Sequence, residues 1–225
     1  MEGNQKQEPR NKTGILYEME SKKARDAERS KKKKGRVVAS LMPAFLIYIL
    51  LVAGMEALSF LSAYCWVFFA PLCAVLCALP VVYMTKKHKN IGVFAAIGIF
   101  WCIVTAVMGI KLSFSGLIIA IIAMAVSELI RRILGYGSKE GICFGYGAAA
   151  LLPLSHQVFL WTDTTEYMNA LAKLAGEKYV DRLGSFATEI ILFLMIIGTV
   201  AVGYFSARFA VRYIKMDKKS PEEQA

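Results

Sequence analysis

The stretch FATEIILFLMIIGTVAVGYFSARFAVRYI, residues 186–214, is apolar over most of its length and is followed by Lys215, Lys218 and Lys219. A helix that crosses the hydrocarbon core of a bilayer needs about 20 mostly apolar residues. This stretch is long enough, and a basic end is typical of the cytoplasmic side of a membrane. The sequence therefore predicts a membrane span that runs inward and ends in the cytoplasm.

Five more apolar stretches precede this one. The six predicted spans are residues 37–60, 62–84, 91–110, 113–133, 141–161 and 186–214. Lys and Arg are concentrated before the first span and after the second, fourth and sixth, whereas the other connections carry few charges or a mixture of both signs. Positive charge on alternate connections places both chain ends in the cytoplasm. We expect an all-α membrane protein, a six-helix transmembrane bundle with N-in/C-in topology.

The composition leaves little chain for a separate soluble domain, because 56% of the residues are hydrophobic. We divide the chain into a basic cytoplasmic tail at 1–36, disordered or partly helical, a six-span membrane domain at 37–216 and a cytoplasmic tail at 217–225. The net charge of +10 lies beside the spans, where topology and anionic lipids explain it, so we expect no nucleic acid partner. The five cysteines form no CxxC, which favours packing over metal binding.

Polar side chains in the predicted spans converge near the outer face. A charge in the hydrocarbon core costs about 3 kcal/mol, so each needs a reason. The candidate substrate-binding residues are Glu56, Trp66, Lys111, His156, Gln157 and Glu189. Structural roles remain open for them. Trp66 is also typical of an interfacial aromatic, Lys111 of a side chain that reaches the headgroups, and Glu189 of an interfacial charge. Glu56 and His156 also suit a pair without a ligand.

Other polar groups have simpler interpretations. Glu128 precedes Arg131 and Arg132 by three and four residues, the spacing of helical ion pairs, so we interpret it as structural. The connection 161–184 predicts a short amphipathic helix over the outer mouth, either an interfacial connector or a lid. Prolines are expected to kink the helices that contain them. They are Pro43, Pro71, Pro80 and Pro153.

Small residues four apart form smooth stripes on two predicted helices. Ser40 and Ala44 lie near the cytoplasmic end of the first span, and Thr199, Gly203 and Ala207 lie in the sixth. Such stripes let helices approach closely. Packing within this chain is the default explanation, and docking of a membrane partner on Ser40 and Ala44 is the alternative.

Four segments resemble one family. They are APLCAVLCALP (70–80) before a basic turn, SELI (127–130), LLPL (151–154) leading to EY (166–167), and GEKYVD (176–181). Together with the six-span plan over about residues 37–215, these segments resemble the MptD-like (Trep_Strep) group of bacterial integral membrane proteins. That group is similar to the substrate-binding S components of energy-coupling factor (ECF) transporters, a class of ABC importers.

The resemblance implies a multi-pass protein of the bacterial cell membrane that captures a small nutrient outside the cell. Delivery would use a transmembrane coupling subunit and two ATPase subunits as partners. The outer helix halves would hold the substrate, and the small face of the first helix, at Ser40 and Ala44, would dock the partner. This chain has no GxxxxGK[ST] phosphate loop, so ATP is expected on partner subunits only and no cofactor is expected here.

Other classes stay open at this point. A stand-alone secondary transporter or channel also places ionisable groups in the membrane, but the spans show no evident inverted repeat. A membrane enzyme is a weaker alternative, because the chain has two histidines and no HExxH or GxSxG motif; we expect no enzyme. A scaffold without a ligand is the remaining class. Mixed charges with aromatics suit a zwitterionic or aromatic nutrient, whereas vitamins, modified bases, metal chelates and porphyrins also fit.

Overall fold

The computed structural model describes residues 22, 41–89, 92–107, 114–162 and 164–214. The chain divides into two units, Met1–Pro43 and Ala44–Ala225, and the arrangement given below is that of the second unit. The predicted basic tail at 1–36 lies outside the described residues except for Lys22, and the predicted tail at 217–225 lies wholly outside them.

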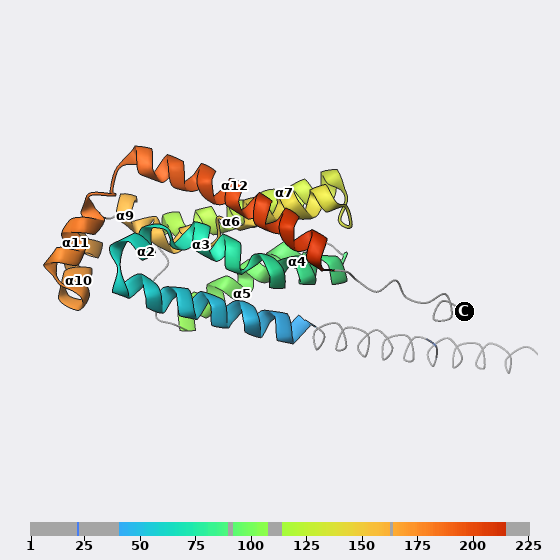
Figure 1. Ribbon diagram of the computed structural model, residues 1–225, viewed down its shortest axis with the longest axis horizontal. Helices are drawn as coiled ribbons and strands as arrows, with labels where there is room; N and C mark the ends of the chain where they lie inside the picture. Colours follow the sequence, from blue (N-terminus) through green and yellow to red (C-terminus); the bar gives the residue numbers. More distant parts are fainter. Residues whose placement is uncertain (1–21, 23–40, 90–91, 108–113, 163, 215–225) are drawn as a thin grey trace, which may run out of the picture. The chain divides into compact units, whose positions relative to one another are not determined.

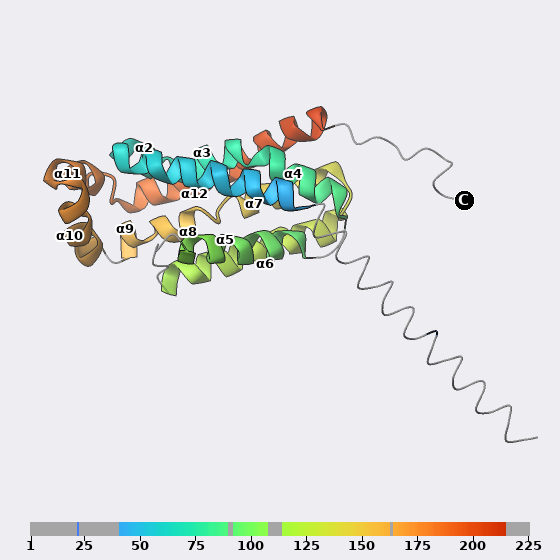
Figure 2. The same cartoon turned by 90° about the horizontal axis from the view of Figure 1, so that it is seen from below.

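Within the described residues every regular element is a helix, which confirms the all-α prediction. The helices are Leu41–Leu61, called the first helix here, α2 (Ala63–Val67), α3 (Phe69–Leu76), α4 (Ala78–Lys87), α5 (Val93–Val107), α6 (Phe114–Leu134), α7 (Lys139–Ala149), α8 (Leu154–Gln157), α9 (Phe159–Thr162), α10 (Thr164–Ala175), α11 (Glu177–Gly184) and α12 (Glu189–Tyr213). Each predicted span coincides with helical structure. The second span is divided into α2, α3 and α4, and the fifth into α7, α8 and α9 (Figures 1 and 2).

Length and composition identify fewer membrane crossings than six. Among the described residues, the first helix and α12 are long and apolar enough to cross a membrane. A third crossing is added if α3 and α4, which meet at 49°, count as one bent span. The six-span bundle and its N-in/C-in topology therefore stay predictions.

Prolines explain where the predicted spans break. A prolyl nitrogen cannot donate to the carbonyl four residues earlier, and its ring crowds that carbonyl. Helix α2 ends four residues before Pro71, α3 ends four residues before Pro80, and α7 ends four residues before Pro153. The predicted kinks are thus observed at these three prolines as helix ends. Pro43 instead lies in the first described turn of the first helix, which continues unbroken to Leu61.

Helix α7 packs against both α6 and α12. A Cβ atom built on Gly203 of α12 would lie 2.8 Å from Cβ of Ala150 and 3.2 Å from Cα of Gly147. Thr199 and Ala207, one turn to either side of Gly203, are fully buried. The predicted small stripe of the sixth span is therefore a close internal contact between α12 and the α7 segment.

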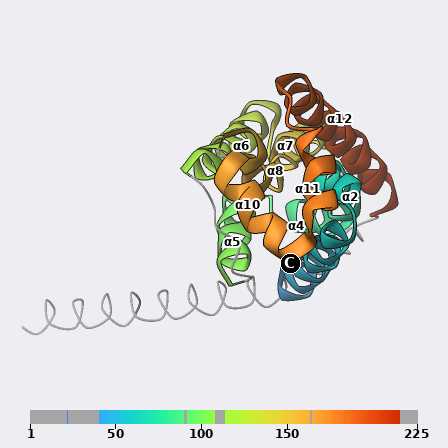
Figure 3. The ribbon, with the colours of Figure 1, turned by 90° about the vertical axis from the view of Figure 1, so that its left-hand side faces the viewer.

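Helices α10 and α11 lie across one end of the second unit, where the connection 161–184 was predicted to form a short helix (Figures 2 and 3). Gly176, with φ of +88°, makes the turn between them. Beneath them is an apolar cluster that includes Trp66, Leu171 and Leu183. The hydroxyl of Tyr179 in α11 donates a hydrogen bond of 2.7 Å to a carbonyl of the first helix, that of Ser59.

Candidate functional site

The centre of the candidate site is a buried pair of ionisable side chains. Glu56 lies in the first helix and His156 in α8, and their Oε2 and Nε2 atoms are 3.6 Å apart. The two residues are only 7% and 5% exposed. Ionisable groups are costly in a hydrocarbon environment and are seldom placed there unless they pair or bind something. The two residues that the sequence assigned to one depth thus face each other directly.

Aromatic rings enclose the imidazole. The ring of Phe69 meets the His156 ring edge to face at a centroid distance of 5.0 Å, and the Trp101 ring lies at 6.1 Å. The indole N–H of Trp101 donates to the hydroxyl of Ser155, 3.2 Å away, and this bond fixes the orientation of the indole. The pair is therefore held between planar apolar surfaces that a flat ligand could also contact.

Gln157 extends the polar site toward α2. It is fully buried, and its side-chain N–H donates to the backbone carbonyl of Trp66. Within the described residues, Oε1 of Gln157 and Nδ1 of His156 make no hydrogen bond of acceptable geometry. A buried polar atom without a partner costs about 1–3 kcal/mol, so such atoms commonly mark a site for water or ligand.

Glu189, one of the predicted site residues, does not join this cluster. Glu189 is exposed and is the first residue of α12, where its carboxylate complements the positive end of the helix dipole. Lys111 lies outside the described residues. The candidate site in the structure consequently comprises Glu56, Trp66, His156 and Gln157.

Sequence reasoning missed four contributors, and one of them is Phe69, whose ring packs on that of His156. Ser155 and Trp101 were not singled out, although Ser155 adjoins His156 and Trp101 lies in the middle of a predicted span rather than at a membrane surface. A tryptophan at mid-span depth is a signal that an interior role should be considered. Tyr179, which joins α11 to the first helix beside Glu56, lies in the segment that carried the family resemblance.

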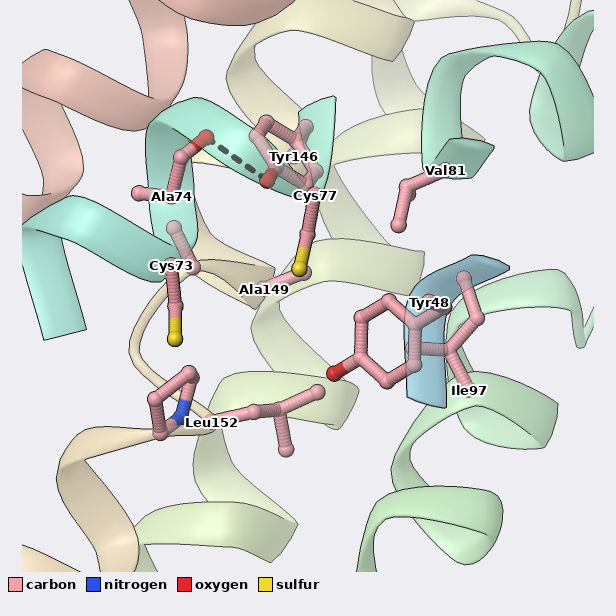
Figure 4. A pocket seen from close by; sticks show the side chains of 11 residues that line it. Tyr48, Cys73, Ala74, Cys77, Val81, Ile97, Tyr146, Ala149 and Leu152 are labelled. Atoms are coloured by element: carbon pink, nitrogen blue, oxygen red, sulfur yellow. Dashed lines mark hydrogen bonds between the residues drawn. The ribbon is translucent and has the colours of Figure 1, made fainter. Parts of the chain in front are cut away.

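A small cavity of about 20 Å³ is lined by residues of the first helix, α3, α4, α5 and α7 and by Leu152 and Pro153. Figure 4 shows the Tyr48 hydroxyl and the thiols of Cys73 and Cys77 directed toward it, while Tyr146 donates a hydrogen bond to the carbonyl of Ala74. The cavity is just large enough for water. Cys73 and Cys77 are buried free thiols here, so they fill space as the sequence predicted.

Glu128 and Arg131 form one of the helical ion pairs that the sequence spacing predicted. The Arg131 guanidinium is fully buried and lies 3.7 Å from Glu128, whose carboxylate accepts a hydrogen bond from the Phe94 backbone N–H at the start of α5. The ring of Phe94 also faces the guanidinium at 5.3 Å. Glu128 therefore joins α5 to α6, which agrees with its structural interpretation. Arg132, by contrast, is exposed.

The predicted docking residues are only partly described. Ala44 is 4% exposed, so this chain covers its methyl group in the conformation observed. Ser40 lies outside the described residues. Docking of a partner at this stripe stays a prediction, and it requires a movement that uncovers Ala44.

Comparison with known proteins gives one match. The family described as hypothetical bacterial integral membrane protein (Trep_Strep) matches residues 35–216, which is most of the chain. Neither the curated proteins nor the solved structures that were searched include a match.

Proposed function

Because the chain belongs to the Trep_Strep family of bacterial integral membrane proteins, we propose that it is the substrate-capturing S component of an ECF-type importer. It would bind a small nutrient at the outer face of the membrane. A transmembrane coupling subunit and two ATPase subunits would supply the energy for import. The proposal assigns no reaction to this chain itself.

The observation that carries this proposal is the buried pair of Glu56 and His156 beneath a helical cover. The pair can accept and donate hydrogen bonds, and Gln157 adds an amide oxygen without a partner among the described residues. Phe69 and Trp101 supply flat apolar walls. A small zwitterionic or aromatic nutrient matches this combination of groups.

In this proposal α10 and α11 act as the cover of the site. They pack on the apolar cluster at the same end of the unit, and α11 is held to the first helix by the hydrogen bond of Tyr179. Opening of this short pair of helices would admit a ligand without disturbing the contact between α7 and α12. A bound ligand would then replace the contact between Glu56 and His156 with contacts of its own.

The proposed topology has six crossings with both ends in the cytoplasm. The basic residues at the ends of α4, α6 and α12, opposite α10 and α11, support it. Lys173 and Lys87 are both exposed and lie at these opposite ends. In whole cells, a cysteine introduced at Lys173 should react with an impermeant thiol reagent, whereas one at Lys87 should not. The reverse pattern would overturn the orientation.

The transport proposal is tested by purifying the full-length chain from its native membrane. Co-purification of two ATPase subunits, together with a small molecule identified by native mass spectrometry, is the expected result. Retention of a ligand without ATPase subunits would instead favour a stand-alone transporter. Absence of both would refute the proposal.

The site is tested with variants once that small molecule is known. Glu56→Gln and His156→Ala should each weaken its binding by about tenfold or more, because one charge-assisted hydrogen bond contributes about 1.5–3 kcal/mol. Glu177→Gln is the matched control, since Glu177 is exposed at the start of α11. Unchanged affinity in both site variants would return Glu56 and His156 to a structural role.

A further inference from the structure

A second cavity lies between α7 and α12, away from the Glu56 site. Its volume is about 290 Å³, which is close to the lower limit for sites that hold small molecules. Six residues line it: Lys139, Glu140, Cys143, Arg208, Val211 and Arg212. The first three come from the start of α7, and the others from the last turns of α12.

The lining is strongly basic. It contains three cationic side chains, Lys139, Arg208 and Arg212, against the single carboxylate of Glu140. Arg208 and Arg212 are one helical turn apart on α12, and like charges at that spacing repel each other. Within the described part of the chain, neither Lys139 nor Arg212 has an ion-pair partner.

Lys86 and Arg208 add to the positive potential of the cavity. Lys86 of α4 is held beside the end of α12, because its Nζ donates to the carbonyls of Val211 and Ile214 at 2.7 and 2.8 Å. Its charge is therefore held close to Val211, one of the lining residues. Arg208 donates through Nη1 to the hydroxyl of Tyr204, 3.0 Å away, which leaves its other N–H groups available.

We propose that this cavity binds the phosphate group of an anionic phospholipid. Guanidinium groups match phosphate oxygens in geometry and can donate two parallel hydrogen bonds to them. Basic pockets between membrane helices bind anionic headgroups, and two of the lining residues, Cys143 and Val211, are buried and apolar. A free phosphate ion offers the same recognition chemistry and is the other source that the experiment distinguishes.

Glu140 indicates which lipid headgroup the cavity prefers. A carboxylate next to a phosphate repels it but accepts hydrogen bonds from hydroxyl groups. The site therefore suits a headgroup in which hydroxyls follow the phosphate, as in phosphatidylglycerol. Removing the charge of Glu140 should strengthen binding of phosphatidic acid, which has a bare phosphate.

The test uses the full-length chain in a neutral detergent. It is titrated with phosphatidylglycerol, phosphatidylcholine and inorganic phosphate, and bound molecules are measured by native mass spectrometry. The double variant Lys139→Gln, Arg212→Gln removes two exposed side chains, so folding is preserved. Each lost charge should weaken binding of phosphatidylglycerol about fivefold, or about 25-fold for the pair. Arg132→Gln is the matched control, because Arg132 is exposed on α6 and does not line the cavity.

Each outcome decides the proposal. Tight binding of phosphatidylglycerol that depends on Lys139 and Arg212, and not on Arg132, supports a lipid site. The same dependence for inorganic phosphate, without lipid binding, supports a phosphate site with a soluble ligand. Equal loss in Arg132→Gln would show a diffuse surface effect and overturn the site. Equal affinity for phosphatidylglycerol and phosphatidylcholine, with no phosphate binding, would overturn it as well.

Discussion

The contact between α7 and α12 predicts that Gly203→Ala destabilises the protein. The added Cβ would lie 2.8 Å from the Ala150 methyl and 3.2 Å from Cα of Gly147, whereas carbon atoms in contact are ordinarily about 3.5–4.0 Å apart. The Ala150 Cβ and the Gly147 Cα cannot rotate away from the added atom, because both are fixed to the backbone. The helices themselves must therefore separate. Overpacking of this kind costs about 1–3 kcal/mol.

Gly198→Ala provides the control for this measurement. Gly198 lies in the same helix, and among the described residues a Cβ built there meets no atom of another helix within 4 Å. Replacing Gly by Ala in a helix gains about 1 kcal/mol in either position. This gain cancels when the two variants are compared, so their difference reports the close contact alone.

Thermal unfolding of the purified protein, followed by circular dichroism, gives the comparison. A chain of this size loses about 2–4 °C of Tm for each kcal/mol, so Gly203→Ala should unfold about 2–12 °C below Gly198→Ala. Adding Ala150→Gly to Gly203→Ala removes the nearest atom and should recover part of the loss. Equal Tm values for Gly198→Ala and Gly203→Ala would refute the close contact.

Two more predictions concern polar contacts. Glu128→Gln keeps an acceptor for the Phe94 N–H but removes the charge beside buried Arg131, so the free energy of unfolding should fall by about 3 kcal/mol, measured by thermal unfolding; an unchanged value would contradict this. Tyr179→Phe removes the bond to Ser59 and should cost about 1 kcal/mol, seen as faster hydrogen exchange in α11. Burial raises the pKa of Tyr179 from its ordinary value of 10.0 to about 12, so this stabilisation is complete below pH 10 and is lost as pH rises through 12. Equal protection of α11 at pH 9 and above pH 12, after correction for the intrinsic rise of amide exchange with pH, would contradict it.

Sequence periodicity and length predicted helices at the right places, but not their interruptions. The apolar run at 62–84 contains Pro71 and Pro80, and each helix ends at the carbonyl that the proline cannot use. Applying this rule of four residues to the sequence would have located the breaks. The number of membrane crossings follows less directly, since short broken helices fail a criterion of length although their composition is apolar.

The candidate site shows a different limit of sequence reasoning. Charge patterns indicate how deep a residue lies along a span, but not the direction in which its side chain projects around the helix axis. Glu56 and His156 share a depth and meet at 3.6 Å. Glu189 was assigned to the same depth, but it is exposed at the start of α12. The direction of a side chain depends on how the helices pack. Helix packing depends in turn on contacts such as those of Gly203 with Ala150 and Gly147. The spacing of small residues predicts that such a contact forms but does not identify the partner helix.

The interruption between α7 and α8 also bears on how such a protein can change through mutation. Gly147 and Ala150, which contact Gly203 of α12, lie before Pro153, and the candidate site residues His156 and Gln157 follow it. Turn hydrogen bonds, not a continuous helix, join the two parts. A substitution that reshapes the part after Pro153 can be accepted without a change in the close contact between Gly147, Ala150 and Gly203. Selection can therefore act on the candidate site and on foldability at separate positions of one segment.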